Sequence, residues 1–411
     1  MWHSLKHWRD WAMNEVRPLL RSGPQSQAIH VSYEKAGLVL HDPVVPWNAD
    51  ALIVEAILRL PPAARRKSDY TLHIPDREPI PAESLKPDAG SDRCRIYFRW
   101  NAMGQQAKEA DLYWKKHRLG QVLIPMLSNV DFFAGLRFES PTVFARIASQ
   151  SVACRTFVAM QCRGLQATAI LRSSTCSLAA ITDLAISVRF RNESDLTTVD
   201  VPVPLCSSQL SAKQALISAH LPKIPRRAGE WTITWHVGDK PMGSQFVRAI
   251  SRRQFLQSLR VSDTRFVVVD GKGQLSLRRQ IPADNSITRA GPCFFVSSSE
   301  VGMAGRCALQ VYAQVPSGPE PPALLQQELL VTDGPTPFAP GLVNIADLAQ
   351  TSAFELRSKS RVLGILPLSP VPSARFNSEG GFTAAPEFPW TPSADEELTE
   401  RLQRLINSPI G

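Results

Sequence analysis

The feature that most constrains this fold is the recurrence of short runs in which apolar and polar residues alternate. The clearest run is GEWTITWHVGDKPMGSQFVRAI at residues 229 to 250, where Trp231, Ile233 and Trp235 alternate with threonine and histidine. Side chains on a strand point to opposite faces with a period of two, so the run predicts a hairpin with both tryptophans on one face. That face either fills the core between two sheets or forms an exposed aromatic platform, and we favour the core.

Comparable runs, with turn residues between them, recur along most of the chain. The charged fraction of 20% is modest and the 33 prolines are many, which suits short strands joined by proline-bearing loops better than long surface helices. With 411 residues, of which 44% are hydrophobic, the chain can build several cores. We therefore predict an all-β protein of tandem β-sandwiches.

Shifts in composition divide the chain into five parts. We expect an amphipathic segment over 1–27, a β-rich domain over 28–148, a β-sandwich over 149–251, a second β-rich domain over 252–370, and an aromatic arm with a helix over 371–411. The stretch SRRQFLQSLR at the start of the 252–370 part has helical spacing of Phe255, Leu256 and Leu259. It predicts a short connecting helix or turn.

The order PKIPRRAGEWTITWHVGDKPMGSQFVRAI resembles the closing F–G hairpin of an immunoglobulin-like domain. In that hairpin a loop bearing proline and glycine leads into an aromatic strand, and a tight turn leads into the last strand. The resemblance implies immunoglobulin-like sandwiches. Cys162 and Cys206 bracket no tryptophan, unlike the cysteines of antibody-type domains, so the resemblance concerns the fold and implies no particular family.

The segment NADALIVEAILRLPP, residues 48 to 62, fits two structures. Its apolar positions match one face of a helix capped by Asn48, whereas its Leu-Ile-Val content and its β-rich surroundings match a buried strand. We favour the strand and keep the helix as the alternative.

Both ends of the chain carry aromatic or apolar side chains that need a surface to dock on. The N-terminal segment reads as a helix that docks on the body or on a partner, with an interfacial membrane helix or a frayed end as alternatives. The C-terminal part has a capping box from Ser393 to Glu396 ahead of an apolar stripe. Its docking surface is either the body of the chain or a protein partner. The candidate partner-binding residues are Trp8, Trp11, Phe382, Phe388, Trp390, Leu398 and Leu402.

The net charge of +9 and the pI near 9.3 are compatible with an anionic partner. We favour solvated surface for the densest basic runs, because nothing in a sequence shows whether separate runs meet on one face. If they do meet, sequence-independent contacts to nucleic-acid phosphates become possible. The candidate phosphate-binding residues are Arg65, Arg66, Lys67, Lys115, Lys116 and Arg118.

The cysteines and histidines indicate neither a disulfide framework nor a metal site. Seven cysteines include no C-x-x-C pair, and the eight histidines do not cluster at ligand spacing, so we expect most cysteines to be small buried hydrophobes. That usage favours a reducing compartment. The N-terminus has charges throughout and no apolar core of a signal peptide or membrane span, so we expect a cytoplasmic protein.

Motifs that carry chemistry are missing from the sequence. There is no G-x-S-x-G elbow, no P-loop and no H-E-x-x-H helix, and we expect no cofactor. Two weak pairings, the Ser297–Glu300 stretch and His236 with Asp239, are more simply a strand edge and an exposed strand face. We predict a non-enzymatic binding or scaffold protein. The alternatives are a nucleic-acid-associated protein and an enzyme with a site between domains.

Overall fold

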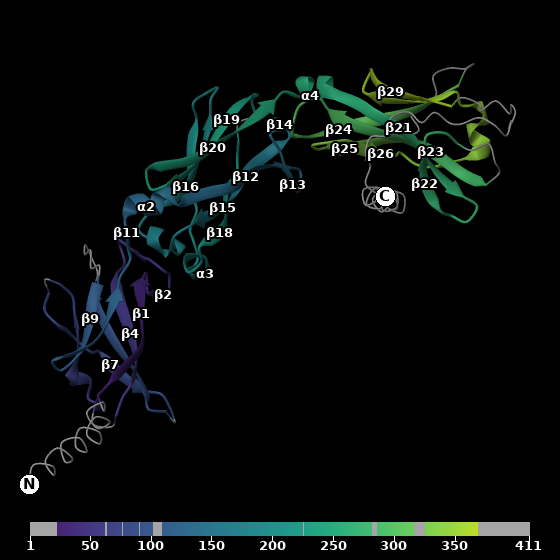
Figure 1. Cartoon of the computed structure of the whole chain (residues 1–411). Coiled ribbons are helices and arrows are strands. Elements are labelled where there is room, and N and C mark those ends of the chain that lie inside the picture. The colour runs from purple at the N-terminus through teal and green to yellow at the C-terminus, as the bar shows by residue number, and fades with distance from the viewer. Residues whose placement is uncertain are drawn as a thin grey trace, which may run out of the picture.

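The computed structural model describes residues 23–61, 64–75, 77–89, 91–101, 109–224, 226–281, 286–315 and 325–368. Within them, strands predominate and every helix is short. The strands form three two-sheet sandwiches that follow one another as a bent rod (Figure 1). The prediction of an all-β chain of tandem immunoglobulin-like sandwiches is confirmed. Both predicted terminal helices lie outside the described residues, and so do Trp8, Trp11, Phe382, Phe388, Trp390, Leu398 and Leu402.

The first sandwich packs a five-stranded sheet against a four-stranded one, around a core that includes Tyr33, Phe98 and Leu112. The first sheet has the order β2 (Leu38–Leu40), β1 (Gln25–Lys35), β4 (Ala51–Arg59), β8 (Arg93–Asn101) and β7 (Ser84–Pro87). The second has the order β10 (His117–Leu123), β9 (Glu109–Trp114), β5 (Tyr70–His73) and β6 (Ile80–Pro81).

The segment that the sequence left open between strand and helix is the central strand β4. Its apolar positions are buried at alternate residues, with Leu52, Val54 and Leu58 all fully covered, and it pairs antiparallel with β1 and β8. Pairing on both sides satisfies its backbone groups, which outweighs the helical spacing of the same residues. Asn48 caps no helix; its amide instead donates to Ala180 O at 2.9 Å.

The second sandwich begins earlier than the composition of the sequence indicates. Strand β12 (Leu136–Ile147) pairs along its length with β15 (Cys162–Ser173), from Leu136 opposite Ser173 to Ile147 opposite Cys162. By strand pairing, the first sandwich therefore ends with β11 (Met126–Leu127), which pairs in parallel with β3 (Val45–Pro46). The short helix α2 (Asn129–Ala134) connects the two sandwiches.

Two sheets enclose the core of the second sandwich. One has the order β13 (Gln150–Ala153), β12, β15 and β18 (Gln214–Leu221). The other has the order β17 (Thr198–Pro202), β16 (Ile186–Asn192), β19 (Gly229–Val237), β20 (Lys240–Ile250) and β14 (Thr156–Val158). The helix α3 (Ser207–Leu210) and the 3-10 turn η3 (Leu178–Ile181) lie in its connections.

Both tryptophans of the β19–β20 hairpin are core residues. Trp231 and Trp235 are each 1% exposed, and the Trp235 ring stacks on Phe138 of the opposite sheet with centroids 5.1 Å apart. The expectation of a core is therefore confirmed. His236, expected on the exposed face, is buried instead, although β19 keeps its alternation through Val237 and the register shift beside it places the extra residue on β20. Neighbouring groups therefore cover the strand face opposite the tryptophans at this position.

The third sandwich shares a sheet with the second. Strand β14 pairs in parallel with β20 on one side and with β24 on the other, so nine strands form one continuous sheet. Beyond β14 this sheet contains β24 (Met303–Gln314), β28 (Ala353–Ser358), β29 (Arg361–Pro367) and, paired with β24, β25 (Leu325–Val331). The facing sheet contains β22 (Leu275–Arg278), β21 (Leu259–Asp270), β23 (Ile287–Ser298), β26 (Thr336–Phe338) and β27 (Val343–Asn344).

The predicted connecting helix is α4 (Arg252–Ser258), at the boundary of these two sandwiches. Ser251 caps it by accepting from Gln254 N, and the Gln254 side chain returns a bond to the Ser251 backbone. Phe255 points into the third core and is fully buried. The helix therefore anchors the start of the third sandwich against the shared sheet.

Candidate functional site

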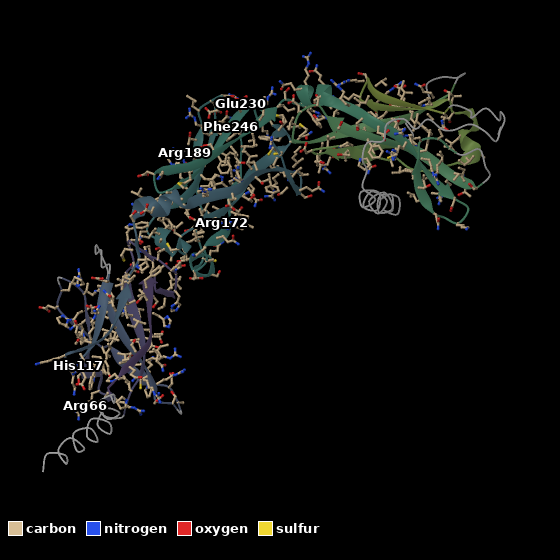
Figure 2. The ribbon with its side chains drawn as sticks, viewed as in Figure 1. Arg66, His117, Arg172, Arg189, Glu230 and Phe246 are labelled. Atoms are coloured by element: carbon tan, nitrogen blue, oxygen red, sulfur yellow. The ribbon has the colours of Figure 1, made fainter. Side chains whose placement is uncertain are left out.

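The two densest basic runs meet at the free end of the first sandwich. One run precedes β5 and the other forms the β9–β10 turn; β5 pairs with β9, and Lys115 N donates to Asp69 O at 2.6 Å. Figure 2 shows Arg66 and His117 together at this end of the rod. All six cationic side chains are exposed. We call this group the basic tip; it consists of Arg65, Arg66, Lys67, Lys115, Lys116 and Arg118.

Half of the basic tip is engaged by neighbouring oxygens. Arg118 donates through Nη2 and Nε to Asp111 Oδ1, at 2.5 and 3.0 Å, and Lys115 Nζ lies 3.8 Å from Asp69. Lys67 Nζ donates to Glu83 O at 3.3 Å. Arg65, Arg66 and Lys116 have no carboxylate within ion-pair distance in the described part of the chain, so the tip keeps a local positive charge.

An aromatic ring lies beside these cations. Lys115 Nζ is 5.0 Å from the centroid of the Trp114 ring, and the His117 ring stacks on Trp114 with centroids 6.0 Å apart. Mixed cationic and aromatic side chains are the groups that proteins use to contact phosphates and bases together.

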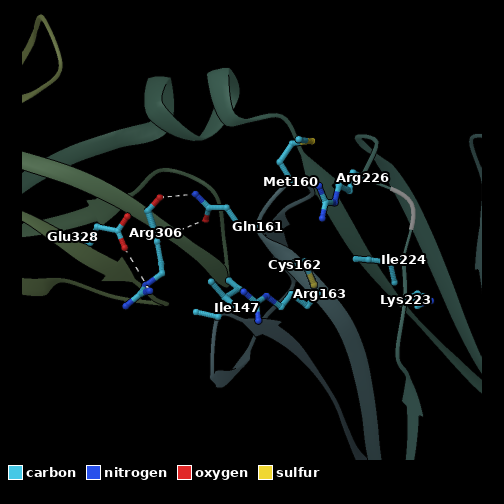
Figure 3. Close-up of a pocket in the computed structure, with 11 residues that line it drawn as sticks. Ile147, Met160, Gln161, Cys162, Arg163, Lys223, Ile224, Arg226, Arg306 and Glu328 are labelled. Atoms are coloured by element: carbon cyan, nitrogen blue, oxygen red, sulfur yellow. Dashed lines mark hydrogen bonds and ion pairs between the residues drawn. The ribbon is translucent and has the colours of Figure 1, made fainter.

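A second cationic region lies between the second and third sandwiches. It is an open cleft of about 700 Å³, which we call the inter-sandwich cleft. Arg306 of β24 and Glu328 of β25 lie on one side, and Arg226 lies on the other (Figure 3). Arg163 of β15 and Lys223 also line it.

One wall of the cleft is fixed by reciprocal hydrogen bonds. Gln161 donates through Nε2 to Arg306 O at 2.6 Å, and Arg306 N donates to Gln161 Oε1 at 2.7 Å. Arg306 Nη1 pairs with Glu328 Oε2 at 3.5 Å, while Arg306 Nε is buried with no hydrogen-bond partner in the part of the chain that the structure describes. The Gln161 amide therefore holds the third sandwich against the end of β14 in the second.

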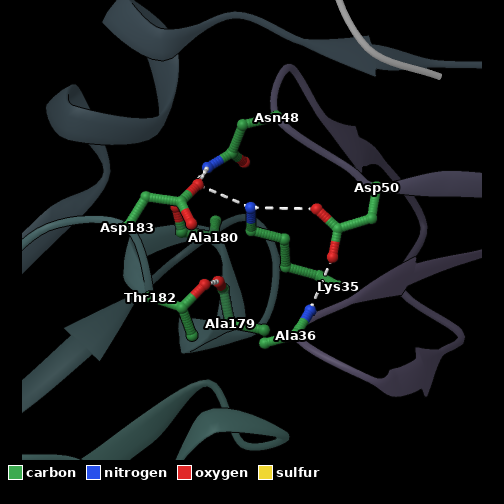
Figure 4. Close-up of polar contacts among 8 residues, drawn as sticks. All are labelled: Lys35, Ala36, Asn48, Asp50, Ala179, Ala180, Thr182 and Asp183. Carbon is green, nitrogen blue, oxygen red and sulfur yellow. Dashed lines mark hydrogen bonds and ion pairs between the residues drawn. The ribbon is translucent and has the colours of Figure 1, made fainter.

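A buried lysine crosses the junction between the first and second sandwiches (Figure 4). The Lys35 side chain is only 4% exposed; its Nζ lies 2.5 Å from Asp183 Oδ2 and 3.3 Å from Asp50 Oδ1. Asn48 Nδ2 donates to the same Asp183 oxygen at 3.0 Å. We call these four residues the lysine junction. The ammonium of Lys35 thus contacts one carboxylate of its own sandwich and one of the second sandwich.

A tyrosine extends this polar contact. Tyr33 Oη donates to Asp42 Oδ2 at 2.6 Å and lies 3.0 Å from Ser177 Oγ, while Ser177 N donates to the same carboxylate oxygen at 2.8 Å. Burial, followed by the hydrogen bond to Asp42, raises the pKa of Tyr33 far above its ordinary value. The hydroxyl therefore remains a neutral donor at any physiological pH.

The two weak catalytic pairings of the sequence are occupied by structural contacts or separated. Ser298 Oγ lies 2.7 Å from Ser258 Oγ, and the Glu300 carboxylate pairs with Arg248 Nη1 at 3.4 Å. The serine thus has a second hydroxyl, not a carboxylate, as its neighbour. His236 is buried in the hairpin.

Three further observations concern the described ranges alone. They contain no group of three or more His, Cys, Asp or Glu side chains arranged to hold a metal ion. None of their helices combines the length and the hydropathy that a bilayer crossing requires. All seven cysteines are free thiols, six of them buried as the sequence predicted, and Cys206 is exposed.

Sequence reasoning missed the inter-sandwich cleft. Its cations come from β15, from the β18–β19 connection and from β24, so no local run brings them together. Arg226 belongs to a visible Arg-Arg pair, but that pair is one of several in the chain. Only the shared sheet, which places β24 beside the end of β15, assembles the site.

Comparison with known proteins identifies no family. No family model and no curated protein matches the chain. Among solved structures, domains 4–9 of the surface layer protein SbsC cover 84% of this chain over 47% of their own length, at 10% identity and TM-score 0.28. The FN1–FN3 domains of chicken CNTN1 cover 85% over 97% of their length, at 9% identity and TM-score 0.21.

A pullulanase from Anoxybacillus also resembles the chain, covering 63% of it over 29% of the enzyme, at 8% identity and TM-score 0.17. A surface layer protein, the CNTN1 domains and a pullulanase thus appear at similarly low scores. At such scores none of these likenesses bears on what this chain binds or does.

Proposed function

We propose that this chain is a non-enzymatic cytoplasmic scaffold that holds binding surfaces at fixed positions along a three-sandwich rod. The observation that carries the proposal is that both junctions between sandwiches are built of specific contacts. Domains joined by exposed flexible linkers move relative to one another by default, and a fixed junction is the exception that needs a reason. A scaffold that sets the spacing of its partners is such a reason.

The second junction is the stiffer of the two. Strand β14 contributes backbone hydrogen bonds to both neighbouring sandwiches, so bending there would break a sheet ladder. The Gln161 amide adds two further bonds to the Arg306 backbone. The first junction depends instead on the lysine junction and on the short parallel pairing of β3 with β11.

Distances across each junction, measured between spin labels by double electron–electron resonance, test this proposal. Cys206 is the only exposed native cysteine and supplies one label in the second sandwich. Lys116→Cys supplies the second label for the first junction, at the end of the first sandwich. Lys272→Cys supplies the second label for the other junction, in the β21–β22 turn of the third sandwich. We expect one narrow distance distribution for each pair.

The matched variant is Asp183→Ala, which removes a carboxylate from the first junction alone. It should broaden the Lys116→Cys to Cys206 distribution and leave the Cys206 to Lys272→Cys distribution unchanged. Broad distributions across both junctions of the otherwise unaltered chain would contradict a fixed scaffold.

A second candidate function is favoured by the convergence of the two basic runs. The basic tip joins three cations without carboxylate partners in the described ranges to the ring of Trp114. Such a surface supports sequence-independent contact with nucleic-acid phosphates. In that case the rod would place its remaining surfaces at a fixed distance from the bound strand.

A further inference from the structure

The inter-sandwich cleft gathers more positive charge than the protein itself neutralises. Four cationic side chains line it, namely Arg163, Lys223, Arg226 and Arg306, against the single carboxylate of Glu328. That carboxylate is engaged by Arg306. Throughout the described ranges, Arg163, Lys223 and Arg226 have no carboxylate within ion-pair distance. Like charges gathered around a recess repel one another and attract anions.

A second observation concerns the wall of the cleft. Arg306 Nε is buried and has no hydrogen-bond partner among the described residues. Buried polar groups in folded proteins nearly always have a partner, and one without a protein partner marks a place for water or a bound group. The Gln161 side chain hydrogen-bonds to both the N–H and the C=O of the Arg306 backbone, so the arginine is fixed at the cleft wall.

We propose that the inter-sandwich cleft binds a small anion that carries two or more phosphate or sulfate groups. A volume of about 700 Å³ is in the range of small-molecule sites. Guanidinium groups match the oxygens of phosphate and sulfate in paired hydrogen bonds. Cations on opposite walls would each engage a different group of the ligand. Ile147, Met160 and Ile224 provide apolar surface for its body.

This site has a structural consequence, because its walls belong to different sandwiches. Arg163 and Arg226 come from the second sandwich and Arg306 comes from the third. A ligand that contacts both walls binds only the assembled junction. It should therefore raise the temperature at which this junction unfolds.

Calorimetric titration of the full chain tests the proposal, with inorganic pyrophosphate as the first probe and a disulfated disaccharide as the second. The test variant is Arg163→Gln with Arg226→Gln; both side chains are exposed, so the fold should be retained. The matched control is Arg66→Gln with Lys116→Gln, which removes two exposed cations from the basic tip. Thermal unfolding of each variant without ligand verifies folding.

We expect one site per chain, binding that weakens as salt is raised, and at least about a tenfold loss of affinity in the cleft variant with no change in the control. Tighter binding of pyrophosphate than of the disaccharide would assign the ligand to the phosphates, and the reverse to the sulfated sugars. Absence of binding by both probes, or an equal loss in both variants, would overturn the proposal.

Discussion

Lys35 and Asp183 lie 148 positions apart in the sequence, yet Lys35 Nζ is 2.5 Å from Asp183 Oδ2 across the first junction. The lysine side chain is almost completely buried, whereas the aspartate side chain is 60% exposed. Burying a charge is unfavourable unless a partner compensates for it. The contact therefore makes the stability of the chain depend on the relative position of its first two sandwiches.

Replacing Asp183 with Ala should lower the free energy of unfolding by about 1–2 kcal/mol. This is less than the loss for a fully buried pair, because Asp183 is mostly solvated and Asp50 still faces Lys35. Denaturant unfolding followed by circular dichroism measures the change. The control is Asp200→Ala, which removes a carboxylate from the exposed Arg189–Asp200 pair and should have an effect under about 0.5 kcal/mol. Equal effects of the two variants would show that the lysine junction contributes no more than a surface pair.

Replacing Trp235 with Ala should destabilise the second sandwich by about 3–5 kcal/mol. The ring is fully enclosed and stacks on Phe138, so its removal leaves a cavity between the two sheets. Phe246→Ala in the paired strand is the control, because that ring is 69% exposed and its loss should matter little. Chemical denaturation compares the two variants. A loss under about 1 kcal/mol for Trp235→Ala would be incompatible with a packed core.

Replacing Gly305 with Ala should destabilise the second junction by about 1–3 kcal/mol. A Cβ at this position would lie 2.8 Å from Val158 Cγ2 and 2.9 Å from Phe255 Cζ, both of them fully buried side chains. Gly243→Ala is the matched control, since a Cβ there meets nothing within 4 Å. Thermal unfolding should show a lower midpoint for the first variant and an unchanged or slightly higher one for the second. Equal midpoints would mean that the shared strand adapts without strain.

Cys206 should be the only thiol of the native chain that reacts with an alkylating reagent near neutral pH. A hydrogen bond with the Ser208 side chain lowers the pKa of Cys206, whereas burial raises the pKa of Cys154 and Cys293 to about 12. The rate should increase with pH up to the pKa of Cys206 and then level off, because the thiolate is the reactive form. Mass spectrometry counts the modified sites, and unfolding should expose all seven. Rapid native modification of a second cysteine would disprove the assignment.

If the basic tip contacts nucleic acid, random duplexes should bind at low salt and dissociate as salt approaches physiological concentration. Reversing the charge of Arg66 and Lys116 should reduce the affinity and make the salt dependence shallower, because fewer counterions are released. The same reversal at Arg189 and Arg191, on the second sandwich, serves as the control. Fluorescence anisotropy measures both. Binding that is undetectable, or unaffected by salt and by the tip variant, would exclude this function.

Local patterns predicted the elements of this fold well. The alternation around Trp231 and Trp235 was enough to place both rings on one face, because a strand allows its side chains only two faces, and the favoured interpretation of that face as core is confirmed. The helical spacing around Phe255 likewise predicted the connecting helix or turn that the structure shows as α4. These features depend only on residues that lie within a few positions of one another, so a local pattern in the sequence is enough to predict them.

The tertiary structure decided what depends on distant pairing. Strand β12 belongs to the second sandwich because it pairs with β15, and His236 is buried although it lies on the strand face opposite the tryptophans. The basic runs converge only because β5 pairs with β9, and the cleft cations meet only because β14 joins two sandwiches. Contacts such as Lys35 with Asp183 form between residues whose proximity is set by the packing of whole sheets. The sequence by itself therefore determined most strands and their apolar faces, and the packing of those sheets determined the basic tip and the inter-sandwich cleft, because both depend on pairing between residues far apart in the chain.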